Sequence, residues 1–305
     1  MVELKTAQAC EVTSGRFCLN SDTPVTLRES TIMSDIFFPK QGWGPDGKRC
    51  ALSITFDNFG EAADLELGSW DGAPLGRHYT AAWLPTLIDA LGEIRATYFV
   101  EAMNAELYPD ALRLWQNNGH EIGIHGWRHE NWAKCDSSRR ITLLRQSMEA
   151  LRAIGIHPKG FRPPGGAIPP EAWDEFQSVG LEYCSNSGSA GIRPVGHLLS
   201  LPFEWQGVDV YMLEDIVAFL RRQQGDSEQA YTLGQWQEHL DHTLERVLEE
   251  GGQRTLIFHP HFLAHSAEKL DVLKRLLDRV REDSNIWVAP TYEVASFAAQ
   301  QLRIS

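Results

Sequence analysis

From Cys50 onward the chain alternates short apolar segments with longer segments of helical periodicity, and this alternation restricts the fold more than any other feature. Most of the short segments are rich in β-branched or aromatic residues, which is typical of strands. They are CALSITF (50–56), ATYFV (96–100), EIGIH (121–125), KGFR (159–162), LEYCS (181–185), HLLSLPF (197–203), TLIFH (255–259) and NIWVA (285–289). Between them, apolar residues recur at helical spacing over 83–91, 233–247 and 270–280, and we interpret these stripes as core-facing. The pattern predicts an α/β fold in which a mainly parallel sheet, wrapped by helices, forms a closed or nearly closed (β/α) barrel of about seven or eight units.

The segment before this alternation has a different character. Residues 1–48 contain scattered Thr, Ser, Pro and Gly and end in the turn cluster GWGPDGK. We expect 1–48 to form an N-terminal arm that packs on the barrel, and 49–305 to form one catalytic barrel. A chain of 305 residues is within the range of single α/β barrels.

Composition and charge exclude several classes of function. With 43% hydrophobic and 23% charged residues, the chain is that of a globular protein. Its formal charge of −13 opposes approach to a phosphate backbone, so we expect no nucleic-acid partner. The N-terminal sequence lacks the features of a secretory leader, and no segment approaches the roughly 20 apolar residues that span a bilayer. We therefore expect no membrane partner, a cytoplasmic location and a small-molecule substrate. A homo-oligomer is compatible with the sequence.

Polar side chains follow four of the predicted strands, at the edge of the barrel where catalytic groups belong. They are Asp57 and Asn58 after the first strand, His125 and His129 after EIGI, Arg162 at the end of KGFR, and His259 at the end of TLIFH.

The two histidines of HGWRH are four residues apart. On a helical turn such residues share a face, so the rings of His125 and His129 can converge on one cation. Two histidines, one oxygen ligand and an open position for water would form a catalytic zinc site. The alternative is a pair of partly exposed surface histidines. The metalloprotease motif HExxH is absent, since HEIGIH has one residue too many.

The other strand-end residues suit acid–base roles. Asp57 could act as a general base toward water on the metal, or it could cap a helix or turn. Arg162 could keep that carboxylate ionised and oriented through a bidentate pair. His259 could protonate a leaving nitrogen, which the cleavage of an amide requires, and His261 is its rival two residues on.

The ordered set SITFDN, GHEIGIHGWRH, GFRPPGG, SLPFEWQGVDV and LIFHPH resembles the polysaccharide deacetylase (NodB-homology) family, also called carbohydrate esterase family four, over roughly residues 50–295. The resemblance implies a distorted (β/α) barrel and a divalent metal, usually zinc, held by an aspartate and both histidines of HxxxH. It also implies a base, an orienting arginine and an acid, which match Asp57, Arg162 and His259. The details HGWRHE, RPPGG and HPHFLAH look closer to the branch of allantoinase-like and cyclic-imide hydrolases and intracellular peptidoglycan-deacetylase relatives.

The sequence departs from the family signature TFDD at one position. The second aspartate, the metal ligand that the resemblance implies, is Asn58 here. An asparagine oxygen can coordinate but carries no charge, so we expect weaker cation binding with His125, His129 and Asn58 as ligands. In the alternative, Asp57 itself binds the metal, and Glu61 or water performs another part of the reaction.

The sequence therefore predicts a metal-dependent hydrolase of a carbon–nitrogen bond other than a peptide bond, acting by deacetylation of a small intracellular N-acetylated compound. One alternative is a hydrolase that opens a cyclic imide or ureide ring. The other is a catalytically impaired binding protein on the same barrel, because the second aspartate of the signature is missing.

Overall fold

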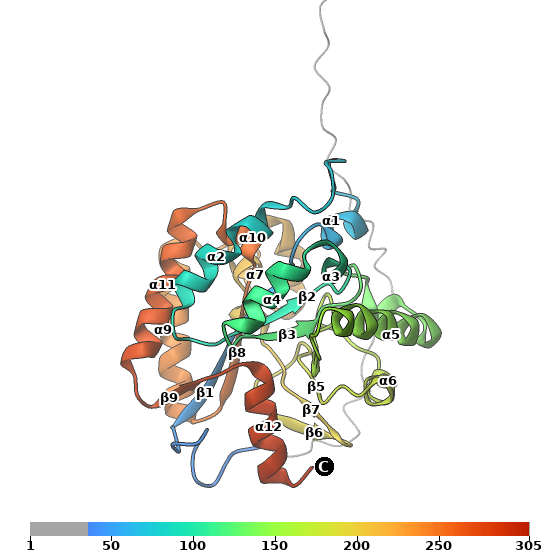
Figure 1. The fold of residues 1–305 in the computed structure, drawn as a ribbon. Coiled ribbons are helices and arrows are strands. Elements are labelled where there is room, and N and C mark those ends of the chain that lie inside the picture. Colours follow the sequence, from blue (N-terminus) through green and yellow to red (C-terminus); the bar gives the residue numbers. More distant parts are fainter. Residues whose placement is uncertain (1–35, 305) are drawn as a thin grey trace, which may run out of the picture. The chain divides into compact units, whose positions relative to one another are not determined.

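The computed structural model describes residues 36–304, in which strands and helices alternate (Figure 1). The strands are β1 (Cys50–Asp57), β2 (Thr97–Val100), β3 (Glu121–Ile124), β4 (Gly160–Phe161), β5 (Tyr183–Cys184), β6 (Arg193–Val195), β7 (Leu198–Ser200), β8 (Gln253–Phe258) and β9 (Ile286–Val288). The α-helices are α1 (Ala62–Leu67), α2 (Tyr79–Leu91), α3 (Asn104–Leu107), α4 (Pro109–Asn117), α5 (Ser137–Ala153), α6 (Ala172–Val179), α7 (Asp209–Leu213), α8 (Ala218–Gln224), α9 (Leu233–Glu250), α10 (Pro260–Leu263), α11 (Ala267–Glu282) and α12 (Thr291–Leu302). Short 3₁₀ turns lie at η1 (Trp132–Lys134), η2 (Trp205–Gly207) and η3 (Asp215–Val217).

The strands of the described residues form one curled sheet in the order β6-β7-β5-β4-β3-β2-β1-β8, and β9 pairs with β1. All neighbours are parallel except β6 and β7. An isolated bridge between Val208 and Ile257 brings the chain after β7 against β8. Helices surround this sheet in Figure 1, with α9 and α11 on one side and α5 on the other. The predicted α/β fold, a distorted barrel, is confirmed.

All eight predicted strands are present, and β6 is an additional one that the sequence pattern did not reveal. It consists of Arg193, Pro194 and Val195, which are half-buried, and it pairs antiparallel with β7. A short strand with a proline at its centre shows no alternation of apolar and polar residues and departs from the usual strand composition. The pattern that identifies buried strands therefore does not identify β6.

Side chains along β1 alternate between the hydrophobic core and the inner face of the sheet, where the candidate site lies. Leu52, Ile54 and Phe56 belong to the large core cluster that also includes the buried apolar faces of α2, α9 and α11. The side chains between them point to the other face, because successive residues of a strand alternate. Thr55 and Asp57 are on that inner face, and both contact the same arginine, described below.

A second core cluster includes residues of the predicted arm. Phe37 and Trp43 pack in it together with Val294 and Ala298 of α12. The Trp43 indole N–H donates a 2.7 Å hydrogen bond to the carbonyl of Gly251. The rest of the predicted arm, residues 1–35, lies outside the described residues, so the arm boundary stays a prediction.

Over residues 36–304, no helix has both the length and the apolar character that crossing a membrane requires.

Candidate active site

Asp57 and Arg162, predicted as base and orienting arginine, form a buried ion pair. Arg162 Nη1 lies 2.6 Å from Asp57 Oδ1 and 2.8 Å from Thr55 Oγ1. Its Nη2 donates to the hydroxyl of Ser185 over 3.0 Å, and its guanidinium carbon lies 4.1 Å from the centre of the Phe99 ring. The arginine is 1% exposed and the aspartate 4%. Such a charge-assisted network fixes the direction in which the second carboxylate oxygen of Asp57 points.

His125 and His129 lie beside this pair, with ring centres 5.0 Å apart. His125 Nδ1 is 2.9 Å from the backbone carbonyl of Arg162. A carbonyl only accepts, so Nδ1 carries the proton and Nε2 keeps its lone pair. That Nε2 is 3.9 Å from Asp57 Oδ2. Burial lowers the pKa of each histidine to about 3, so both rings are neutral near pH 7, which is the form that binds metals.

The two histidines lie in a loop, so the helical turn that the i, i+4 spacing predicted is wrong. The backbone is left-handed at Gly126 (φ 80°) and at His129 (φ 79°). The Glu130 carboxylate accepts the N–H groups of Trp127 and Arg128, each over 3.0 Å, and closes the loop. The rings converge because of this loop geometry, which spacing alone does not encode.

Glu101 completes the cluster, and the sequence analysis missed it. It directly follows β2, and one carboxylate oxygen and one ring nitrogen each from His125 and His129 all lie within 4.8 Å of one another. The side chain is 0% exposed, and burial raises its pKa to about 8. A signal was available: Glu101 is a carboxylate at the end of the apolar run TYFV, the same position that singled out Asp57 after β1.

Asn58, predicted as a metal ligand, turns its amide nitrogen toward Glu101. The Asn58 Nδ2 group donates to Glu101 Oε1 over 2.9 Å, and the Phe59 backbone N–H donates to Oε2 over 3.0 Å. The backbone of Asn58 is left-handed, with φ of 64°. Its carbonyl accepts a 2.9 Å hydrogen bond from the Tyr98 hydroxyl. The prediction that Asn58 itself binds the metal stays a prediction.

The residues fit a divalent cation. Two neutral imidazoles and one carboxylate form the donor set of many catalytic zinc sites, which keep a further position open. The fit also rests on the Glu101 carboxylate, which is fully buried and accepts hydrogen bonds only from uncharged groups among the described residues. A buried anion in such surroundings is stabilised by a nearby cation.

His259, predicted as the acid, is held by a second residue that the sequence analysis missed. Asp209, the first residue of α7, is 0% exposed. Its Oδ1 lies 2.6 Å from His259 Nδ1, and its Oδ2 accepts the His259 backbone N–H over 2.7 Å. Burial lowers the pKa of His259, but attraction to and the hydrogen bond with the Asp209 carboxylate, together with attraction to Asp57, outweigh burial, so the pKa is raised. The rival His261 has a pKa lowered to about 4, first by burial and then by repulsion from His259. Near pH 7 the geometry therefore favours His259 as the proton donor.

Asp209→Asn is expected to shift the alkaline limb of the pH profile of kcat/KM to lower pH by about one to three units. The wild-type carboxylate favours protonated His259, whose acid function is present below its folded-state pKa and lost as pH rises through it. Removing the negative charge lowers that pKa. Asp226→Asn is the matched control, because Asp226 accepts from Tyr211 of the same helix over 2.5 Å. A profile unchanged in Asp209→Asn would contradict the assignment.

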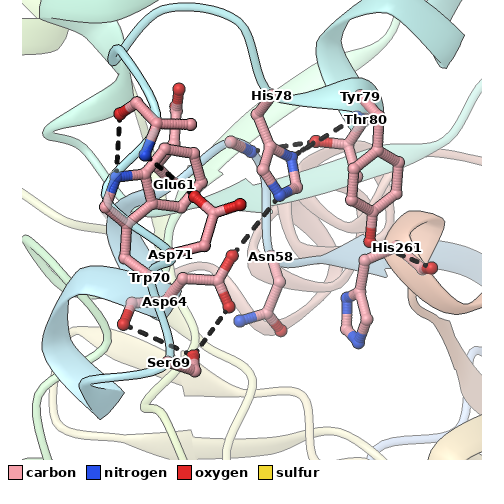
Figure 2. A network of polar contacts seen from close by, with 12 residues as sticks. Asn58, Glu61, Asp64, Ser69, Trp70, Asp71, His78, Tyr79, Thr80 and His261 are labelled. Carbon is pink, nitrogen blue, oxygen red and sulfur yellow. Dashed lines mark hydrogen bonds and ion pairs between the residues drawn. The ribbon is translucent and has the colours of Figure 1, made fainter. Parts of the chain in front are cut away.

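Hydrogen bonds and an ion pair hold the segment between β1 and α2 at the edge of the site, as Figure 2 shows. His78 Nε2 lies 3.4 Å from Asp64 Oδ2, and its Nδ1 is 2.7 Å from the Thr80 hydroxyl at the start of α2. This contact with His78 is the main reason why the pKa of Asp64 is lowered. The Tyr79 hydroxyl donates to the carbonyl of His261 over 3.3 Å. The segment therefore joins α1, α2 and α10 at the rim.

Glu61 holds the same segment. It is 0% exposed, and its Oε1 accepts the backbone N–H groups of Gly76 over 2.8 Å and Arg77 over 3.2 Å. A carboxylate oxygen engaged in this way stabilises the loop, and the catalytic alternative considered for Glu61 stays a prediction.

Sequence comparisons match parts of this chain to known deacetylases. The sequence profile of the polysaccharide deacetylase family matches residues 46–184. Chitin deacetylase 1 of Saccharomyces cerevisiae is 40% identical over 75 residues, which are 24% of this chain and 25% of that protein. A peptidoglycan-N-acetylglucosamine deacetylase of Bacillus cereus is 36% identical over 128 residues, 41% of this chain and 39% of the relative. The chain thus matches well under half the length of these relatives.

Solved structures extend the likeness to most of the chain. A structure described as a candidate polysaccharide deacetylase from Mycobacterium smegmatis superposes with a TM-score of 0.73 at 25% identity, covering 88% of this chain and 96% of that one. The PuuE allantoinase superposes with a TM-score of 0.67 at 18% identity, covering 86% and 94%, a likeness that concerns the fold alone. These matches confirm the predicted resemblance to the polysaccharide deacetylase (NodB-homology) family, carbohydrate esterase family four, whose sequence profile covers residues 46–184 of this chain.

Proposed function

We propose that this protein is a metal-dependent hydrolase that removes the acetyl group from a small N-acetylated compound. The observation that carries the proposal is that three groups of residues, most of them at the ends of separate strands, lie at one site. They are the Glu101, His125 and His129 cluster, the Asp57–Arg162 ion pair and the Asp209–His259 pair. These supply a cation site, a base and an acid, the set that hydrolysis of an amide requires.

Each described residue has a definable task in this reaction. A divalent cation held by Glu101, His125 and His129 would supply Lewis acidity toward the amide carbonyl and the attacking water. Asp57 takes a proton from that water, and Arg162 holds the carboxylate in place.

Departure of the nitrogen needs a second proton. His259 donates it from Nε2, because its Nδ1 faces Asp209. One water is consumed, the carbon–nitrogen bond breaks, and acetate and a free amine are formed.

The acetamido group of an N-acetylglucosamine unit is the first substrate to test. It is the group indicated by the name of the Bacillus cereus relative, and the Saccharomyces cerevisiae relative is named for chitin. That the substrate is small and the location cytoplasmic remain our proposals, as does the expectation of no nucleic-acid partner.

The test uses protein stripped with a chelator and reloaded with zinc. We expect zinc-dependent release of acetate and a free amine, in equal amounts, from N-acetylglucosamine or its short oligomers. Cyclic imides and ureides are assayed in parallel, because their hydrolysis opens a ring and releases no acetate. Ring opening alone would replace deacetylation by the alternative hydrolase. A protein that neither rebinds zinc nor turns over any of these compounds would be a binding protein.

A further inference from the structure

We propose that the carboxylate that binds the metal is Glu101, and that Asn58 is not a ligand but the positioning residue that aims this carboxylate. The inference rests on the proposed function, since it concerns the same cation site. It replaces the ligand set His125, His129 and Asn58 by His125, His129 and Glu101, and it gives Asn58 a task that only an amide performs.

The first argument is the distribution of buried charge. Asp57, Glu101 and Glu130 are buried carboxylates that lie near one another, and Arg162 is directed at Asp57 alone among them. Glu130 is satisfied by backbone N–H groups of its own loop. Glu101 is left facing the two imidazoles without a cationic side chain among the described residues, so among these three carboxylates it is the one that a bound cation would compensate.

The second argument is the direction of the Asn58 amide. Its Nδ2 group and the Phe59 N–H each hold one oxygen of Glu101, at 2.9 and 3.0 Å. Each oxygen accepts one hydrogen bond and keeps a second lone-pair site, so the carboxylate can still bind a cation. Donors of this kind fix the orientation of a metal-binding carboxylate.

The third argument is that the amide of Asn58 and the carboxylate of Glu101 are chemically complementary. Adjacent parallel strands bring positions 58 and 101 together, since Asp57 of β1 is in register with Phe99 of β2. The left-handed backbone of residue 58 suits asparagine and tolerates aspartate. An aspartate there would place a second carboxylate against Glu101 and lose the donor. The pair therefore needs one carboxylate and one amide, and in this chain the carboxylate is at position 101.

The test compares zinc stoichiometry and zinc affinity, measured by competition with a chelator, in four folded proteins. Glu101→Gln removes the ligand charge, and we expect affinity to fall about 100-fold or more. Asn58→Ala removes only the amide that orients Glu101, and we expect zinc affinity to fall about 10-fold. In Asn58→Asp/Glu101→Gln the two chemical groups exchange places, and we expect the double variant to recover at least about 10-fold relative to Glu101→Gln.

Controls separate this inference from general damage. Glu121→Gln changes another glutamate, which is half-buried at the start of β3, the end of the strand away from His125, and accepts hydrogen bonds from Thr97 and Tyr183. The zinc affinity of this variant should equal that of wild type. Melting temperatures without zinc report folding. If Glu101→Gln does not fold, Glu101→Asp keeps the charge one methylene further away and is expected to bind zinc about 10-fold more weakly.

The results distinguish the two proposals. If wild type binds zinc through His125, but Glu101→Gln and Glu101→Asp keep that affinity while Asn58→Ala loses it, Asn58 is the ligand and only this inference is overturned. If wild type binds no zinc, the inference and the proposed function both fall.

Discussion

Asp57→Asn is expected to lower kcat for acetate release by about 10²- to 10⁴-fold while leaving zinc stoichiometry unchanged. The carboxylate is the only anion that Arg162 contacts within the described residues, and its second oxygen lies 3.9 Å from His125 Nε2. Asparagine keeps the shape of the side chain but cannot accept a proton at neutral pH. The rate should therefore fall through the loss of the base, as measured by steady-state kinetics on the zinc-loaded variant.

The same substitution is also expected to reduce the free energy of unfolding by about 3 kcal/mol, because Arg162 is left buried without an anion. Urea unfolding of the metal-free proteins measures this. Asp241→Asn is the matched control, since Asp241 pairs with Arg279 at 2.6 Å on the partly exposed surface, and we expect it to cost less than about 1 kcal/mol. If Asp57→Asn loses zinc together with activity, Asp57 is a metal ligand, which is the alternative that the sequence left open.

Glu175→Gln is expected to reduce the free energy of unfolding by about 3 to 5 kcal/mol without changing kcat of the folded protein. Glu175 of α6 and Arg140 of α5 form a buried bidentate pair, with both nitrogen–oxygen distances at 2.7 Å. Their side chains are 5% and 3% exposed. An amide in place of the carboxylate leaves the guanidinium of Arg140 buried without its main anion. This loss should loosen the packing of α5 against α6.

Glu171→Gln provides the control for this second result. Glu171 accepts from the same guanidinium over 3.1 Å, but its side chain is 58% exposed, so water solvates the guanidinium in its place and we expect a much smaller loss of stability than in Glu175→Gln. Urea midpoints of the two variants give the comparison directly. Equal destabilisation by both would contradict the view that burial makes the Glu175 pair the stronger one.

The sequence predicted the framework well because the signals of buried strands and helices are local. Leu240 and Leu244 of α9 recur at helical spacing and are buried, while β1 is an unbroken buried strand. The failures have local causes too. Pro194 conceals a short strand, and the left-handed backbone at Gly126 places a residue spacing typical of a helix in a loop.

The candidate site was predicted in part. Polar residues at strand ends identified Asp57, Arg162 and His259, because parallel strands bring their carboxyl ends to one edge. Glu101 follows the same rule at the end of β2 and was passed over, since nothing in TYFVE alone distinguishes a ligand from a solvated glutamate. Asp209 carries no strand-end signal, because it begins a helix.

The sequence by itself determined which segments become strands and helices and which strand ends carry chemistry, since both depend on residues close together in the chain. Only the tertiary structure decided which of those ends meet. Glu101 faces Asn58 because β2 is the neighbour of β1 in the sheet, and Asp209 holds His259 because the chain after β7 returns to β8. Strand order and register are set by packing over the whole barrel, so contacts between distant residues appear only once the core has formed.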